Sequence, residues 1–227
     1  MTLYIIRHGE TALNRQNIVQ GSGVDSELNA TGREQAQLFF NYYQNIAFDL
    51  VITSALKRTH QTVAPFLRHL SLKKTPLIDL NTMDLRAIKA KKWLQFQELN
   101  EICWGINEGK TSSPESEVFY KKLMEDWLSG VYDSRIEAGE SAAELRERVQ
   151  KFVDFIRKMP EKSNVLVCTH GRTLLCLLTI LNEHPLSKMN DFKHQNTGLY
   201  KVHFVENEFI FELENDAQHL GELKIKN

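Results

Sequence analysis

The chain opens on Leu3-Tyr-Ile-Ile-Arg-His-Gly-Glu-Thr11, an apolar run that stops at two basic residues and a glycine. The four residues Leu3–Ile6 are apolar and β-prone, which is typical of a buried strand. Arg7 and His8 lie where the chain leaves that strand, and Gly9 permits the backbone angles that such a turn requires. The stretch therefore predicts a strand that delivers polar side chains to one edge of a sheet.

Two further apolar runs end in a similar way. Residues 49–53 are followed, one helical turn later, by Arg58, and residues 164–168 are followed at once by Thr169, His170 and Gly171. In open sheets of parallel strands, ligands bind outside the carboxyl ends of the strands. We therefore expect these side chains to meet those of the first stretch at one edge of the sheet, although they are far apart in the sequence.

Helical patterns separate the predicted strands. Thr31–Glu34 and Ser141–Glu144 have the form of capping boxes and predict the starts of two helices, while Ser54 is a candidate cap for a third. Residues 199–213 read as a terminal hairpin. The alternation of strands and helices predicts an α/β fold with a largely parallel sheet, and 227 residues without a linker predict a single domain over 1–227.

The composition excludes several classes of protein. The 28 Lys and Arg residues are balanced by 29 Asp and Glu, so the basic excess of a dedicated nucleic-acid binder is absent. No apolar run approaches the roughly 20 residues that a bilayer requires. The 3 cysteines form no CxxC pair, which argues against a structural zinc site. We expect a cytoplasmic protein with no nucleic-acid or membrane partner.

Two arginines and two histidines around one point suit phosphoryl transfer. Guanidinium groups bind phosphate oxygens in a planar, bidentate manner. A neutral imidazole can attack phosphorus, and the arginines with a second, charged imidazole would hold the charge that develops. Fixed cations of this kind take the place of a metal ion, so we expect neither a metal nor a cofactor.

At this point the sequence resembles the histidine phosphatase superfamily, the phosphoglycerate mutase-like proteins. Six blocks occur in the family's order and span residues 3–171. The blocks are Leu3–Thr11 with Asn14 and Gln20-Gly21; Leu28, Gly32, Gln35 and Ala36; Thr53–Arg58 with Gln61-Thr62; Leu99–Gly105 with Glu108-Gly109; Gly139–Ser141; and Thr169–Gly171.

The resemblance implies a three-layer α/β/α fold and a set of residue roles. It implies that His8 is the nucleophile that accepts the phosphoryl group, and that Glu101 donates a proton to the leaving oxygen. His170 is implied as the second catalytic histidine. The residues implied to bind the substrate phosphate are Arg7, Asn14, Gly21, Arg58 and Gly171.

Three functions stay open on the sequence. The first is a phosphatase that acts on small phosphomonoesters, sugar bisphosphates among them, and the second is a mutase that returns the phosphoryl group to another oxygen. Family mutases carry an arginine pair after the glutamate block, and its absence from residues 110–120 favours the phosphatase. The third, a non-catalytic phospho-ligand module, is disfavoured because both histidines and a candidate acid are present. A homodimer is compatible with the sequence.

The stretch at 81–97 is longer than the family's usual connection and combines basic with aromatic residues. A solvated face is the ordinary fate of such a charge cluster. The alternative hypothesis places it at the pocket mouth, where a basic rim would favour substrates with a second anionic group. The residues concerned are Arg86, Lys89, Lys91, Lys92, Trp93 and Phe96.

Residues outside the family blocks receive simpler interpretations. The histidines outside the blocks are expected to be surface or core residues; they are His60, His69, His184, His194, His203 and His219. Asn196-Thr197-Gly198 precedes the final hairpin and is expected to pack beside the catalytic loop.

Overall fold

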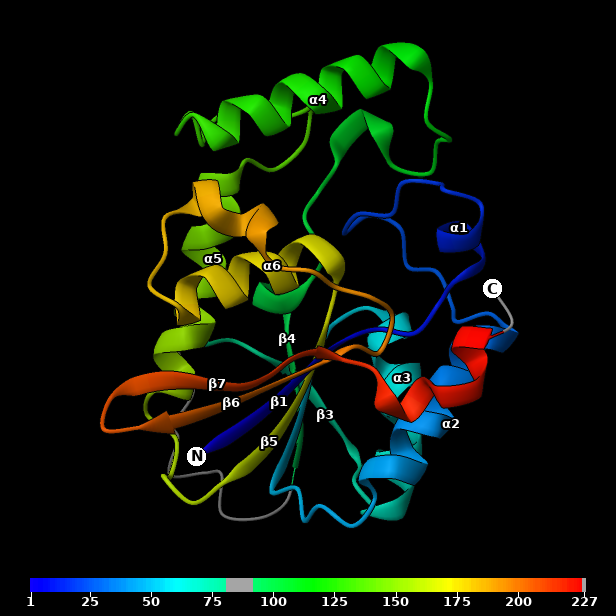
Figure 1. The fold of residues 1–227 in the computed structure, drawn as a ribbon, viewed down its shortest axis with the longest axis vertical. Helices are drawn as coiled ribbons and strands as arrows, with labels where there is room; N and C mark the ends of the chain where they lie inside the picture. Colours follow the sequence, from blue (N-terminus) through cyan, green and yellow to red (C-terminus); the bar gives the residue numbers. More distant parts are fainter. Residues whose placement is uncertain (81–91, 226–227) are drawn as a thin grey trace.

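The computed structural model describes residues 1–80 and 92–225, which form a seven-stranded sheet between helical layers (Figure 1). The strands are β1 (Thr2–Arg7), β2 (Leu50–Ser54), β3 (Lys74–Ile78), β4 (Lys92–Phe96), β5 (Asn164–Thr169), β6 (Leu199–Val205) and β7 (Glu208–Asp216). Their order is β3-β4-β2-β5-β1-β6-β7, in which the first five are parallel, β6 is antiparallel to β1, and β7 is antiparallel to β6. The predicted α/β class with a largely parallel sheet is confirmed.

Helices cover both faces of this sheet. They are α1 (Ala12–Arg15), α2 (Ala30–Tyr43), α3 (Lys57–His69), α4 (Pro114–Leu128), α5 (Ala142–Ile156) and α6 (Gly171–Leu181), with 3-10 turns at Gln97–Leu99, Gly105–Asn107, Leu186–Asp191 and Gln218–Ile225. Helices α2 and α3 lie on one side and α5 and α6 on the other, while α4 lies farther from the sheet (Figure 1). None of the described helices has the length and apolar character needed to cross a membrane.

The apolar run of β1 is explained by burial on both faces. Leu3 and Ile5 pack in the core beneath α5 and α6, whereas Tyr4 and Ile6 pack in the core beneath α2 and α3. Successive side chains of a strand point to opposite faces, so a strand covered on both sides must be apolar at every position.

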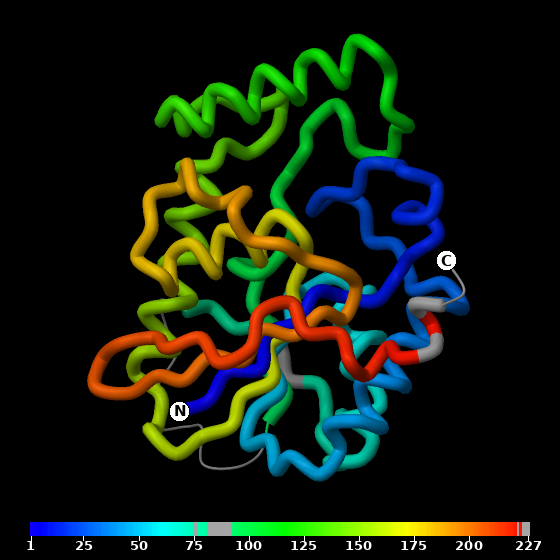
Figure 2. The backbone as a smooth tube through the Cα atoms, in the orientation of Figure 1, coloured from blue at the N-terminus to red at the C-terminus, as the bar shows by residue number. Residues whose placement is uncertain are grey.

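The pairing of β1 with β5 brings the two histidines together. The strands lie side by side in parallel (Figure 2), and Arg7 is the register partner of Thr169. One more hydrogen bond, from the His8 amide to the Thr169 carbonyl at 3.0 Å, continues the ladder past the strand ends. His8 and His170 therefore leave neighbouring strands at the same level.

Two of the predicted helix starts are wrong by a few residues. Helix α2 begins at Ala30, and its cap is Asn29, whose side chain accepts from the Gly32 amide, rather than Thr31. Helix α3 begins at Lys57, after a strand that includes Ser54; the Ser54 hydroxyl accepts from the Leu56 amide but does not cap the helix. The capping box at Ser141 is confirmed.

The hypothesis that residues 81–97 form a basic pocket rim is wrong for the part that the structure describes. Residues 92–96 are the inner strand β4, in which Trp93 and Phe96 are buried. Lys92 is paired with Leu50, at the start of β2. It therefore lies at the amino ends of the parallel strands, whereas His8 lies at their carboxyl ends. Arg86, Lys89 and Lys91 lie outside the described residues.

The terminal hairpin is confirmed, with β7 extending to Asp216. Its turn is Glu206-Asn207, and both residues have positive φ angles of 50° and 70°. Two left-handed residues give a turn whose twist matches that of the flanking strands.

The cap of α2 gives a test of this part of the fold. Asn29→Ala is expected to lower the free energy of unfolding by about 1 kcal/mol, because the Gly32 amide loses its acceptor. Thr31→Ala is the matched control, since the Thr31 hydroxyl only accepts an exposed bond from Arg15, and we expect a change below about 0.5 kcal/mol. Urea denaturation measures both, and a larger loss in Thr31→Ala would restore Thr31 as the cap.

Candidate functional site

His8 is buried where the chain leaves β1, and its surroundings fix its tautomer. The Nδ1 atom lies 2.7 Å from the carbonyl oxygen of Gly9, which can only accept, so Nδ1 carries the hydrogen. The Nε2 atom is then left with a free lone pair. Burial, and next the charges of Arg58 and Arg7, hold the pKa of His8 well below its ordinary value. His8 is therefore a neutral imidazole with Nε2 available to an electrophile.

The side chain of His170 is engaged by protein on both nitrogens. Arg58 Nε can only donate, so the 3.0 Å bond to His170 Nδ1 leaves the ring hydrogen on Nε2. That hydrogen is donated to the Ser54 hydroxyl, 2.7 Å away. The Ser54 hydroxyl is in turn hydrogen-bonded to the hydroxyl of Thr59. Burial followed by the charge of Arg58 also holds the pKa of His170 well below its ordinary value. His170 is therefore neutral in this arrangement, and the charged second imidazole that the sequence predicts for the transferring phosphoryl group stays a prediction.

Arg58 is fully buried, with 0% of its surface exposed. Besides Nε, its Nη1 atom donates to the Val24 carbonyl at 2.6 Å and its Nη2 atom to the Gly21 carbonyl at 3.2 Å. Burial lowers the pKa of Arg58 to about 10, so the group is still charged at neutral pH. A guanidinium has five N–H donors, and two remain after these three bonds.

Arg7, at the end of β1, contacts a histidine that the sequence did not single out. Arg7 Nη1 donates to His194 Nδ1 at 3.2 Å, so His194 carries its hydrogen on Nε2. Burial, with the charge of Arg7 next, lowers the pKa of His194 to about 4. Arg7 Nε is buried and has no hydrogen-bond partner among the described residues, as expected of a donor kept for a ligand.

Glu101 is held at the N-terminus of α6. Its Oε1 atom accepts from the amides of Ile102 and Thr173, both at 3.0 Å, and its Oε2 atom accepts from the Arg172 amide at 3.2 Å. The partial positive charge of a helix N-terminus favours a carboxylate there. A Cβ on Gly171 would lie 3.2 Å from His194 Cε1, so the glycine allows His194 to pack closely against the start of α6.

Gly21 and Asn14 lie in the segment after β1, Asn14 within α1. The Gly21 carbonyl accepts from Arg58, and a Cβ there would lie 2.7 Å from the backbone carbonyl oxygen of Ile102, so only glycine fits. Asn14 Oδ1 accepts from the Thr11 amide in a capping box at the start of α1.

The loop before β6 lies against the start of the site, as the sequence predicted. Asn196 Nδ2 donates to the His8 carbonyl at 2.7 Å, and the Thr197 amide donates to the Arg7 carbonyl at 3.0 Å. These bonds satisfy the backbone carbonyls of the last residue of β1 and of the residue that follows it. Within residues 1–80 and 92–225, no group of three or more His, Cys, Asp or Glu side chains is arranged to hold a metal ion.

The family model described as the histidine phosphatase superfamily (branch 1) matches residues 3–98 and 85–217 of this chain. The chain belongs to this superfamily. Members of the histidine phosphatase superfamily are enzymes, and the cluster of His8, Arg7, Arg58 and His170 lies at the sheet edge where the family blocks end.

Individual relatives cover nearly the whole chain. A probable phosphoglycerate mutase GpmB of Yersinia enterocolitica is 28% identical over 225 residues, which cover 97% of this chain and 95% of that protein. The structure of a putative alpha-ribazole-5'-P phosphatase of Escherichia coli is 25% identical with a TM-score of 0.75, covering 95% of this chain and 96% of that one. A phosphoserine phosphatase of Entamoeba histolytica has the same fold, with a TM-score of 0.75, 22% identity and coverage of 96% and 98%.

Sequence reasoning missed His194 because nothing local marks it. It lies in an irregular loop, outside every family block, and only the packing of that loop against the end of β1 places it beside Arg7. The sequence-based interpretation of His194 as a surface or core residue did not include this contact with Arg7.

The contact with Arg7 predicts how His194 variants of this histidine phosphatase behave. His194→Leu should lower kcat/KM about 10- to 100-fold, the scale of a lost hydrogen bond to a charged group. His194→Asn, whose Oδ1 can replace Nδ1 as the acceptor, should retain most of the activity. Steady-state kinetics on one phosphomonoester measures this, and equal losses in both variants would show that ring packing, not the bond to Arg7, matters.

Proposed function

We propose that this chain is a phosphatase that hydrolyses small phosphomonoesters through a phosphohistidine on His8. The observation that carries the proposal is the state of His8, which is neutral with its Nε2 lone pair free, beside two guanidinium groups. A neutral imidazole is the nucleophilic form, and the guanidiniums match the equatorial oxygens of a transferring phosphoryl group.

In the first step, His8 Nε2 attacks phosphorus while the bond from phosphorus to the ester oxygen breaks. The free N–H groups of Arg7 and Arg58 bind the phosphoryl oxygens, and Arg7 Nε is the donor that lacks a protein partner. Glu101 donates a proton to the departing alkoxide. Its Oε2 atom accepts one bond, from Arg172, and retains a second lone pair for that proton.

In the second step, Glu101 as a carboxylate takes a proton from water, and the water oxygen attacks phosphorus. The bond from phosphorus to Nε2 breaks, and its electron pair returns to His8. The sum is an ester and water converted to an alcohol and inorganic phosphate. Asn14, Gly21 and Gly171 would shape the phosphate pocket, and a neutral His170 would orient Arg58 through their mutual bond.

A second candidate is the mutase reaction, which the names of the curated relatives favour. Both reactions share the phosphohistidine, and they differ in whether water or the bound product accepts the phosphoryl group. Water labelled with oxygen-18 separates them, because only hydrolysis yields labelled inorganic phosphate. Without an arginine pair in residues 110–120, we expect the labelled product.

The phosphohistidine is tested by rapid quench with a phosphate-labelled ester. Wild-type protein should carry acid-labile, base-stable label, and because its pKa is lowered His8 should still react at pH 5.5. His8→Ala should carry none. His184→Ala is the matched control, since that histidine is exposed, and it should keep the label. Label in His8→Ala would overturn the proposal.

The role of Glu101 is tested by leaving-group dependence. Glu101→Gln should lower kcat about 10²- to 10⁴-fold for alkyl phosphates, whose alkoxides need a proton. For p-nitrophenyl phosphate, which departs as a stable phenolate, the loss should be below about tenfold. Equal losses with both esters would mean that Glu101 only positions the N-terminus of α6, where it accepts from Arg172 and Thr173.

A further inference from the structure

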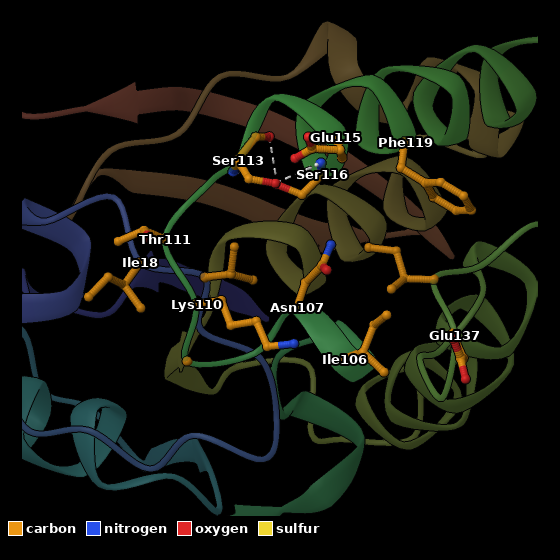
Figure 3. Close-up of a pocket in the computed structure, with 13 residues that line it drawn as sticks. Ile18, Ile106, Asn107, Lys110, Thr111, Ser113, Glu115, Ser116, Phe119 and Glu137 are labelled. Carbon is orange, nitrogen blue, oxygen red and sulfur yellow. Dashed lines mark hydrogen bonds between the residues drawn. The ribbon is translucent and has the colours of Figure 1, made fainter.

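A cavity of about 710 Å³ lies between the loop after β1, the loop before α4 and α4 itself (Figure 3). It adjoins a second cavity of about 690 Å³, and the two share Ile18, Val19, Asn107, Ser116 and Ile136. Volumes of this size are typical of small-molecule sites.

The inner end of the second cavity lies one side chain away from the groups proposed for catalysis, and none of His8, Arg58 and Glu101 lines it. Gln20, which lines it, donates to the Thr11 hydroxyl at 2.8 Å, three residues after His8. Tyr120, on its α4 side, accepts from Arg172 Nη2 at 2.7 Å, and the Arg172 amide donates to Glu101. The alcohol part of a long ester would reach this space past Gln20 and Tyr120.

The walls of the outer cavity are mainly apolar. Ile18, Ile106 and Phe119 come from three different segments around it (Figure 3), and Val19 and Ile136 complete the apolar lining. Ile106 and Phe119 remain 47% and 60% exposed, so the fold itself does not bury them. Covering these side chains with an apolar ligand would be favourable, because apolar surface would leave water.

The charges around the two cavities are mostly acidic. Lys110 is the one basic residue among the described side chains that line them, whereas Glu115, Glu117 and Glu137 carry negative charge. Like charges repel a second anionic group on a substrate. A carboxylate at the far end of a long alcohol would approach these glutamates, whereas the basic Arg172 lies at the inner end, beside Tyr120.

We propose that the preferred substrates are phosphomonoesters of apolar, uncharged alcohols, whose hydrocarbon part occupies this cavity. The proposal rests on the phosphatase function above and specifies its substrate class. In this proposal, the residues at the carboxyl ends of the strands bind the phosphate, and the cavity formed with α4 selects the alcohol part of the ester.

A homologous series of n-alkyl phosphates from ethyl to octyl tests this class. Their alkoxides have nearly the same basicity, so differences report the cavity and not the chemistry. Each added methylene should raise kcat/KM about twofold to fourfold until the cavity is filled. A fourfold increase corresponds to a methylene that is completely buried in the cavity. The ester of equal length that ends in a carboxylate should be at least about tenfold poorer.

Phe119→Ala should flatten the dependence of kcat/KM on chain length, because the removed ring is part of the apolar wall of the cavity. Val118→Ala is the matched control: Val118 is the neighbouring residue on α4 and 71% exposed, but it does not line the cavity, so the full slope should remain. An identical slope in Phe119→Ala and wild type would overturn the assignment of the cavity.

These measurements distinguish a failure of the proposed substrate class from a failure of the proposed phosphatase function. Release of phosphate that depends on His8 but is equal for every chain length, or faster for the carboxylate esters, would overturn the substrate class and leave the phosphatase standing. Release from no ester by the wild-type protein would overturn both.

Discussion

The buried guanidinium of Arg58 is the interaction on which the site depends. A buried charge is costly unless its hydrogen bonds are satisfied, and here three acceptors from two separate segments bind it. They are the carbonyls of Gly21 and Val24 and the Nδ1 atom of His170. One side chain thereby joins the loop after β1 to α3 and to the end of β5. Removing it would leave all three acceptors unpaired in the interior.

The same constraint sets the protonation of the histidines. Because Arg58 can only donate, His170 must present a lone pair, and its hydrogen goes to Ser54. In the same way, Arg7 donates to Nδ1 of His194, so the ring hydrogen of His194 is on Nε2. His8 is the exception, since its Nδ1 bonds a carbonyl and its Nε2 lone pair stays free. The two arginines thus supply the positive charge, while the imidazoles stay neutral.

The fold divides recognition between two regions. The groups proposed to bind the phosphate lie at the carboxyl ends of β1 and β5, where the parallel ladder sets their spacing, and on α3. The apolar cavity lies farther out, between irregular loops and α4. Loops and an outlying helix can change without disturbing the sheet, which is why proteins that share such a core can act on different substrates.

The sequence by itself determined the α/β class, the family and the edge of the sheet at which His8 and His170 meet. These follow from short-range patterns: apolar runs, the residues that end them, and the rule that parallel strands deliver side chains to one edge. Only the tertiary structure decided that Asn29 rather than Thr31 caps α2, because both residue types suit a cap and the backbone determines which oxygen meets the amide.

The tertiary structure also decided the neutral state of His170, the contact of His194 with Arg7 and the apolar cavity. A proton's position depends on which donor faces each nitrogen, and the donors come from residues more than 100 positions away. The cavity joins Ile18, Ile106 and Phe119 from segments without a shared periodicity, so no local pattern could have revealed it. Long-range packing alone brings such residues together.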